Sequence, residues 1–368
     1  MDNNKIPPLS SFTSKKTIAP KRAVDHFSMK QGQKESIIST NDDAASCKLS
    51  AVDKGYYIDD FVKHFVKVPI KRPPLINRGF FSRVEAIEQF IKQFFTSYSQ
   101  ERKQIVSLGC GFDTLYFRLK KRGDTQNLVF FEVDYEEVVK NKIKIIKAQK
   151  ELYQMIDQEW SQKLSGDYSS NVKINSPYYR LGCIDLKSLE TFEIFDQLGI
   201  DYNLPTLFLS ECVLIYIPTE CGNNTIHWAS SKFTESLFIT YEQIKPSDEF
   251  GQMMLKNIEI KGCPLLSIQS FPEIKDQKKR YLDKGWNRVD VLDMRDVYNY
   301  FIDKNRIKET ERLEIFDEFE EWDLIQTHYC YVLAIKSSQH LNDFNFENTK
   351  PLNSNNNNNN SINNKFIS

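Results

Sequence analysis

Short apolar runs alternate with longer, charged amphipathic stretches through most of this 368-residue chain. Each run is bounded by Gly, Asp or Glu, and this alternation is typical of βα units with a mostly parallel sheet. The run at residues 128–131 is continuously apolar, as expected of a strand buried on both faces. An α/β fold is therefore predicted, with strands at residues 105–108, 128–133, 178–184, 206–209 and 237–240 and two later strands at 288–292 and 329–335.

Two other stretches complete this outline. Apolar residues recur at helical spacing over residues 80–95, which predicts a helix that lies on the sheet or caps it. Residues 151–173 are mixed and polar and contain Gly166, so they are predicted to be an insertion between the second and third strands.

Both ends of the chain are polar. Residues 1–40 have no apolar period and are predicted to be a disordered lead-in. Residues 337–368 include the asparagine run 355–360 and are predicted to be a disordered Asn-rich tail. The folded domain is expected to span residues 41–336.

Charge and composition exclude several classes of protein. The 49 Lys and Arg residues against 50 Asp and Glu residues argue against a dedicated nucleic-acid binder, which needs a surplus of positive charge. Neither a membrane-spanning run nor a secretory h-region is visible, so a monomeric cytoplasmic protein without a membrane partner is expected. The seven cysteines never form a CxxC pair, which favours free thiols and predicts no metal site.

A glycine-containing turn follows the first predicted strand. Gly109, Cys110 and Gly111 stand where the backbone of a strand-to-helix turn can approach a ligand. Thr114 occupies the position of the third glycine in a dinucleotide fingerprint, which counts against NAD. A tight connection without a ligand is the alternative.

Acidic residues follow the next strands. Asp134, Asp185 and Glu211 each come at or just after a predicted strand, and ligands of open α/β sheets bind at these carboxyl ends. Asp134 is placed to accept hydrogen bonds from ribose hydroxyls, although it could instead cap the helix that begins near Glu136. Asp185 could likewise be an N-cap, whereas a buried Glu211 without a partner would be costly.

The pattern resembles the class I S-adenosylmethionine-dependent methyltransferases and, more narrowly, the leucine carboxyl methyltransferase family, of the type that methylates the C-terminal leucine of the protein phosphatase 2A catalytic subunit. The resemblance spans roughly Asp43 to Ile335. It rests on the blocks Ser-Cys-Lys at 46–48, Ile-Asn-Arg-Gly-Phe-Phe-Ser-Arg-Val at 76–84, Leu-Gly-Cys-Gly-Phe-Asp-Thr at 108–114, Phe-Glu-Val-Asp at 131–134, Ser-Glu-Cys-Val-Leu-Ile-Tyr at 210–216, Tyr-Glu-Gln at 241–243 and Phe-Gly-Gln-Met-Met at 250–254.

The resemblance implies a Rossmann-like, mostly parallel sheet with added N-terminal helices and insertions that form a substrate-side lid. It also implies S-adenosyl-L-methionine as cofactor and assigns residues to it. Lys48 and Arg83 would hold the methionine carboxylate, Gly109 would pass beneath the amino-acid portion, Asp134 would bind the ribose, Asp185 and Leu186 would border the adenine, and Glu211 would fix the methionyl amino group. Without the motif, Lys48 and Arg83 would be taken for surface residues.

Methylation of an α-carboxylate needs no general base, because this group is already ionised at pH 7. Positioning and exclusion of water are therefore expected to supply the catalysis. Tyr216 and Tyr241 are candidates for the substrate side, with a packing role as the alternative. Packing or surface roles are predicted for His64, His227 and His328.

Two alternatives compete with this interpretation. The related wybutosine-type tRNA carboxyl methyltransferase adds kelch repeats, and the short polar segment after Ile335 disfavours it here. A phosphatase-binding protein that has lost its activity is the second, and the intact Lys48, Arg83, Gly109, Asp134 and Glu211 argue against it. The basic residues Lys63, Lys67, Lys71 and Arg72 could attract an acidic phosphatase tail or could be only a solvated face.

Overall fold

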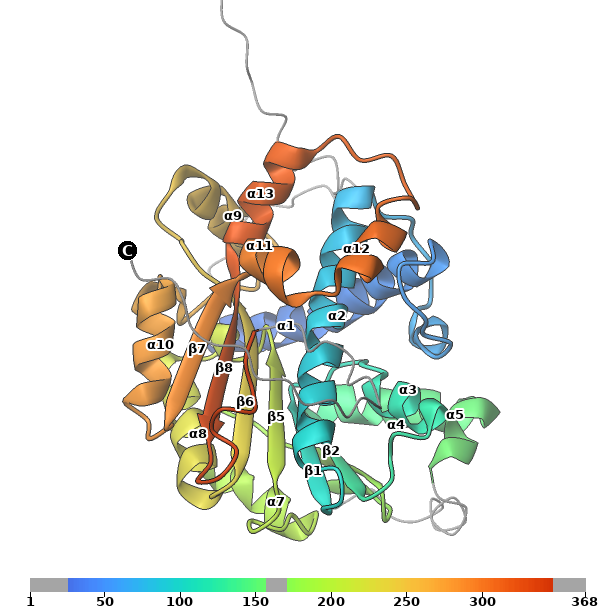
Figure 1. Cartoon of the computed structure of the whole chain (residues 1–368), viewed down its shortest axis with the longest axis vertical. Coiled ribbons are helices and arrows are strands. Elements are labelled where there is room, and N and C mark those ends of the chain that lie inside the picture. Colours follow the sequence, from blue (N-terminus) through green and yellow to red (C-terminus); the bar gives the residue numbers. More distant parts are fainter. Residues whose placement is uncertain (1–25, 157–170, 347–368) are drawn as a thin grey trace, which may run out of the picture.

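A single sheet of eight strands runs through the computed structural model, which describes residues 26–156 and 171–346 (Figure 1). The strand order is β3-β4-β2-β1-β5-β6-β8-β7. The strands are β1 (Lys103–Leu108), β2 (Leu128–Asp134), β3 (Val172–Asn175), β4 (Tyr179–Cys183), β5 (Thr206–Glu211), β6 (Ser236–Gln243), β7 (Arg288–Asp293) and β8 (Tyr329–Lys336).

The helices either cover the sheet or extend beyond its strand ends (Figure 1). They are α1 (His26–Asp53), α2 (Pro74–Ser97), α3 (Leu115–Arg122), α4 (Glu136–Ala148), α5 (Lys150–Met155), α7 (Glu193–Gln197), α8 (Thr219–Lys232), α9 (Glu249–Ile260), α10 (Ile274–Leu282), α11 (Met294–Asp296), α12 (Lys304–Thr310) and α13 (Phe319–Thr327). Short 3-10 turns include η4 (Leu214–Tyr216), and a π-helical turn, η6 (Val297–Phe301), follows α11.

The strand directions fix where a ligand can bind. Strands β4, β2, β1, β5 and β6 pair in parallel, whereas β3, β8 and β7 are antiparallel to their neighbours. The chain moves from β1 through β2 to β4 on one side and then returns to place β5 on the other side of β1. In open α/β sheets this reversal leaves a crevice at the carboxyl ends of the two central strands.

Alternate side chains of each strand enter different cores. Ile105 of β1 and Leu207 of β5 pack with α2, α3 and α4, whereas Val106 of β1 and Phe208 of β5 pack with α7, α8 and α10. This period of two places an apolar layer on both faces, because strands enclosed by helices need one on each. All seven residues of β2 are buried, as the sequence predicted for a strand covered on both faces.

The sequence missed some element boundaries. The short strand β3 was not predicted, because its residues fall partly within the expected insertion; residues 157–170 of that insertion lie outside the described part. The helix predicted over residues 80–95 begins already at Pro74, whose fixed φ suits the first position of a helix.

The predicted lead-in at residues 1–40 is wrong for residues 26–40, which form the first half of α1. The later half of α1 is buried from Ala45 to Ala51, and helix extension from such an anchored segment adds one hydrogen bond per residue. Because residues 26–40 are polar and have no apolar period, their helix could not be predicted from the sequence. Residues 1–25 lie outside the described residues, so that part of the prediction stays a prediction.

The predicted tail at residues 337–368 is likewise wrong for its first part. Phe344 is completely buried, and the ring of Phe346 contacts the rings of Phe90 and Phe301 at centroid distances of 5.3 and 5.5 Å. Two aromatic side chains thus dock an otherwise polar segment against α2. Residues 347–368, including the asparagine run, lie outside the described residues.

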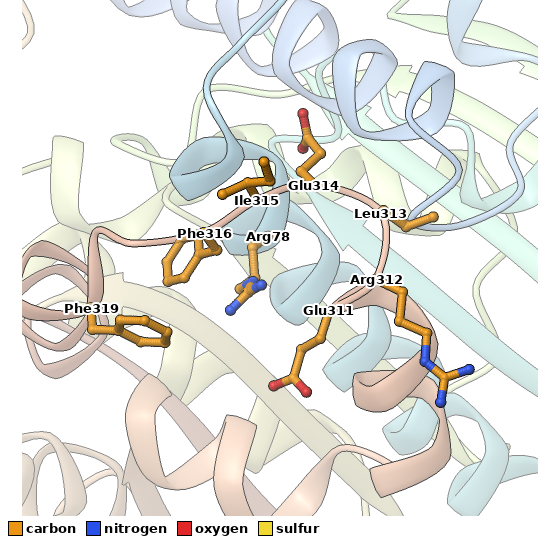
Figure 2. Close-up of a pocket in the computed structure, with 8 residues that line it drawn as sticks. All are labelled: Arg78, Glu311, Arg312, Leu313, Glu314, Ile315, Phe316 and Phe319. Atoms are coloured by element: carbon orange, nitrogen blue, oxygen red, sulfur yellow. The ribbon is translucent and has the colours of Figure 1, made fainter.

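The loop between α12 and α13 is held against α2 by Arg78. The guanidinium carbon of Arg78 lies 3.8 Å from the ring centroid of Phe316, and Asn77 donates a 2.9 Å hydrogen bond to Glu314. Figure 2 shows Arg78 pointing from α2 toward this loop, beside an open cleft of about 620 Å³. These contacts orient α13, which reaches the carboxyl ends of the strands.

Candidate active site

Two glycines shape the turn after β1. Gly109 and Gly111 have φ values of +60° and +50°, which other residues rarely adopt. A Cβ at Gly109 would lie 2.6 Å from the side chain of Val213, and one at Gly111 would lie 2.5 Å from Oδ1 of Asn41. The turn therefore requires glycine at both positions, for its conformation and for the close approach of neighbouring side chains.

Asp134 at the end of β2 closes this turn. Its Oδ2 accepts a 2.7 Å hydrogen bond from the backbone N–H of Gly111, and its Oδ1 accepts one of 2.6 Å from Tyr135. Burial raises the pKa of Asp134 to about 6, although the two backbone N–H groups act in the opposite direction. The carboxylate is therefore fixed beside the glycine turn. The N-cap of α4 is Tyr135, so the alternative role of Asp134 as the cap is not observed.

Two cations stand on the α1 and α2 side of the same edge. Nε of Arg83 lies 2.5 Å from Oε2 of Glu211, and the Arg83 guanidinium lies 4.8 Å from the ring centroid of Tyr241. Burial alone would lower the pKa of Arg83, but the Glu211 carboxylate together with Cys212, Tyr241 and Tyr331 outweighs it and holds this pKa well above its usual value. Lys48 donates a hydrogen bond to Asp113 in the glycine turn.

A cavity of about 1040 Å³ joins these groups at the carboxyl ends of the strands. Its walls come from α1, α2, the glycine turn, the ends of β2, β5 and β6, and the helices α9 and α13. The predicted site residues that line it are Lys48, Arg83, Gly109, Asp134, Leu186, Glu211, Tyr216 and Tyr241. The structure thus brings together side chains from widely separated segments of the sequence.

Asp185 is the predicted site residue whose side chain does not line the cavity in the described structure. Its Oδ1 accepts a 3.0 Å hydrogen bond from the backbone of Lys187, and its side chain is 40% exposed. Ile184 and Leu186 on either side of it do line the cavity. Asp185 therefore stabilises the turn that presents these two apolar neighbours, and it is not the N-cap of the following helical turn, where Ser188 stands.

A buried network beneath the glycine turn was not predicted. Lys142 of α4 has no exposed side-chain surface, lies 2.5 Å from Oε2 of Glu132 and donates a 2.9 Å hydrogen bond to the carbonyl of Asp113. The Tyr179 hydroxyl donates a 2.5 Å hydrogen bond to the same Glu132 carboxylate. Glu132 stands inside an otherwise apolar strand, and that was the signal available in the sequence.

The histidines lie elsewhere. His328 is buried and lies 2.8 Å from Asp248, His64 pairs with Glu151, and His227 contacts the carbonyl of Lys284. These packing and surface roles agree with the prediction. All seven cysteines are free, and no group of three His, Cys, Asp or Glu side chains within residues 26–156 and 171–346 is arranged to hold a metal ion.

Comparison with known proteins identifies the family. The family model for leucine carboxyl methyltransferase matches residues 36–230. A leucine carboxyl methyltransferase 1 homolog of Arabidopsis thaliana is 39% identical over 86% of this chain and 94% of its own length. The chain belongs to the leucine carboxyl methyltransferase family. The assignment confirms the predicted α/β methyltransferase fold and the predicted cofactor, S-adenosyl-L-methionine.

Other members of the family carry two kinds of name. Leucine carboxyl methyltransferase 1 of Rattus norvegicus is 33% identical over 83% of this chain and 92% of its own length. The tRNA wybutosine-synthesizing protein 4 of the same organism is 36% identical over 83% of this chain, but this match covers only 44% of that protein. Family membership therefore gives the type of enzyme but not its substrate.

Among residues 26–156 and 171–346, no helix combines the length and the apolar character that crossing a bilayer requires.

Proposed function

We propose that this protein transfers a methyl group from S-adenosyl-L-methionine to the α-carboxylate of the C-terminal leucine of the protein phosphatase 2A catalytic subunit. The product is a methyl ester, and the loss of the terminal negative charge would regulate phosphatase assembly. The observation that carries the proposal is one continuous cavity in which a charged region at the strand ends adjoins an apolar region under α9 and α13.

The charged region suits the cofactor. Lys48 and Arg83 match a carboxylate, Glu211 matches an ammonium group, and Asp134 matches ribose hydroxyls. The buried Leu186, beside Ile184, offers an apolar surface for an adenine ring. These residues therefore fit the carboxylate, the ammonium group and the ribose of S-adenosyl-L-methionine, which supplies, when bound, a methyl group activated on a sulfonium.

The remaining surface suits a carboxylate acceptor. A terminal carboxylate is ionised at pH 7 and is already a nucleophile, so no side chain has to remove a proton. The chain's own residues then contribute by orienting the carboxylate and by excluding water that would hydrate it. Tyr241 is buried and Tyr216 lies beside the cavity after β5, so both are placed to contact the acceptor.

The apolar part of the cavity suits a leucine side chain. Phe250, Met254 and Ile258 line it from α9, and Ile325 lines it from α13. Relatives named leucine carboxyl methyltransferase 1 match this chain over more than nine-tenths of their own lengths. Both observations support a protein C-terminus as the acceptor.

The alternative is a tRNA nucleoside with a carboxyl group, as the name of the wybutosine-synthesizing relatives suggests. Both hypotheses invoke a carboxylate acceptor and one cofactor. They differ in the remainder of the substrate, which would be an apolar peptide end or a polyanionic RNA. The formal net charge of -1 favours the peptide.

The test is methyl incorporation from labelled S-adenosyl-L-methionine into three acceptors: the intact phosphatase 2A catalytic subunit, the same subunit without its terminal leucine, and tRNA. The proposal expects label on the intact subunit alone, and that label should be lost on treatment with base, as an ester requires. Gly109→Ala serves as the inactive control. Label on tRNA alone, or equal label on both forms of the subunit, would refute the proposal.

A further inference from the structure

Two buried glutamines line the cavity described above. Gln243 ends β6 and Gln326 lies on α13; both line the cavity, and each side chain is 3% exposed. The side chain at 243 faces the same side of the sheet as Tyr241, because strand residues alternate. Gln243 and Tyr241 therefore face the same cavity, which Gln326 lines from α13.

The amide oxygens of both glutamines lack partners. Within the described residues, Oε1 of Gln243 and Oε1 of Gln326 are buried and accept no hydrogen bond. An unpaired buried acceptor destabilises a fold, and most such groups in proteins are satisfied. Gln104, which is buried away from the cavity, accepts a 2.9 Å hydrogen bond from Asp201 and donates one of 2.7 Å back to it. Because Gln243 and Gln326 line the cavity, a ligand bound there can satisfy their oxygens, whereas the equally unpaired Oε1 of Gln277 lies away from it.

The distance of Gln243 from Tyr241 indicates which group of the substrate this glutamine would contact. Gln243 lies two residues beyond Tyr241 along β6, which is about 6.6 Å along a strand. A peptide whose terminal carboxylate lies near Tyr241 has its preceding peptide groups one or two residues away, at about 3.8 Å per residue. The side-chain amide of glutamine complements a peptide group, since each has an N–H donor and a C=O acceptor.

We propose that Gln243 and Gln326 bind the main-chain amides of the last residues of the substrate. This inference rests on the proposed function and adds a specificity: the enzyme recognises leucine as the end of a peptide chain, by accepting backbone N–H hydrogen bonds at Oε1. Free leucine, which has no peptide N–H, would then be a poor acceptor even though its side chain and carboxylate are unchanged.

The test compares two synthetic substrates with the sequence of the phosphatase tail. One is the ordinary peptide, and in the other the amide N–H of the terminal leucine is replaced by an ester oxygen. The wild type should methylate the ester analogue with kcat/KM about 10-fold lower, which is the value of one or two hydrogen bonds. Gln243→Met and Gln326→Met should each raise KM for the peptide and leave cofactor affinity unchanged. At least one of the two variants should methylate the peptide and the ester analogue with equal kcat/KM.

Gln277→Met is the matched control. Gln277 is also buried and has an unpaired Oε1, but it lies on α10 and does not line the cavity, so the peptide preference should persist in this variant. Equal losses on both substrates in the Gln243 and Gln326 variants would overturn the inference and leave the proposed function intact. If the wild type methylates neither the peptide nor the intact subunit, the proposed function fails, and the inference that rests on it fails with it.

Discussion

At the scale of single residues, the site is built from charges that already have protein partners. Arg83 pairs with Glu211, Lys48 pairs with Asp113, and both oxygens of Asp134 accept backbone hydrogen bonds. Pairing stabilises these buried charges in the absence of a ligand and holds them in one geometry. The side chains are therefore oriented before the cofactor arrives.

Replacement of Arg83 by lysine tests whether the planar guanidinium matters. Arg83→Lys keeps the charge but removes the fork that matches a carboxylate, so cofactor affinity should fall by about 10- to 100-fold. Calorimetric titration with S-adenosyl-L-methionine measures this loss. Arg122→Lys, at a half-exposed arginine outside the cavity, is the control and should bind normally. Unchanged affinity in Arg83→Lys would contradict the assignment.

The raised pKa of Asp134 predicts a pH dependence of cofactor binding. With a pKa of about 6 in the ligand-free protein, the carboxyl is largely ionised at pH 7.5 and largely protonated at pH 5. Ribose hydroxyls donate best to the ionised form, so affinity should decline as the pH falls through 6, by at most about tenfold per pH unit. Binding titrations between pH 5 and 8 measure this slope, and Asp134→Asn should bind weakly without it.

At the scale of elements, β2, β4, α4 and the glycine turn are joined by the buried Glu132, Lys142 and Tyr179. Burial raises the pKa of Glu132 against the opposing effect of Lys142, whose own pKa is raised despite burial because of the neighbouring Cys110 and Glu132. The ammonium group of Lys142 also binds the carbonyl of Asp113. This network therefore couples the cofactor turn to the sheet beneath it.

Removal of one partner should be more harmful than removal of both. Lys142→Met leaves the Glu132 carboxylate buried without its counter-ion and should lower the free energy of unfolding by about 3–5 kcal/mol. The double variant Lys142→Met with Glu132→Gln should recover part of this loss. Urea unfolding of the wild type, both single variants and the double variant gives the coupling; strictly additive losses would argue against a coupled pair.

At the scale of the whole molecule, segments from both ends of the described chain complete the fold. The helix α1 lines the cavity, and the segment after β8 returns across the sheet to pack against α2 (Figure 1). The carbonyl of Asn345 accepts a 3.0 Å hydrogen bond from Gln93, and Ser337 donates one of 2.6 Å to Glu235. Residues 345 and 346 of this terminal segment therefore pack against α2, the helix that carries Arg83.

Replacement of Phe344 tests how much the terminal segment contributes to the free energy of unfolding. Its side chain is completely buried, so Phe344→Ala should lower the free energy of unfolding by about 3–5 kcal/mol. Ile315→Ala, at a side chain that is 92% exposed, is the control and should change it by less than about 0.5 kcal/mol. Similar stability in both variants would mean that the terminal segment contributes little. Thermal or urea unfolding measures the difference.

The sequence by itself determined the α/β class, seven of the eight strands and the family, because burial periodicity and strand-end motifs are local properties of the chain. Eight of the nine site residues that it named line the cavity, since parallel strands bring their carboxyl ends to one edge. Only the tertiary structure decided the partners of these residues: the pairing of Arg83 with Glu211, the contact of Lys142 with the glycine turn, and the turn-forming position of Asp185. Each depends on elements far apart in sequence or on local backbone geometry, which composition and spacing do not specify. The docked segments at residues 26–40 and 337–346 were missed for the same reason, because long-range packing overrode their polar composition.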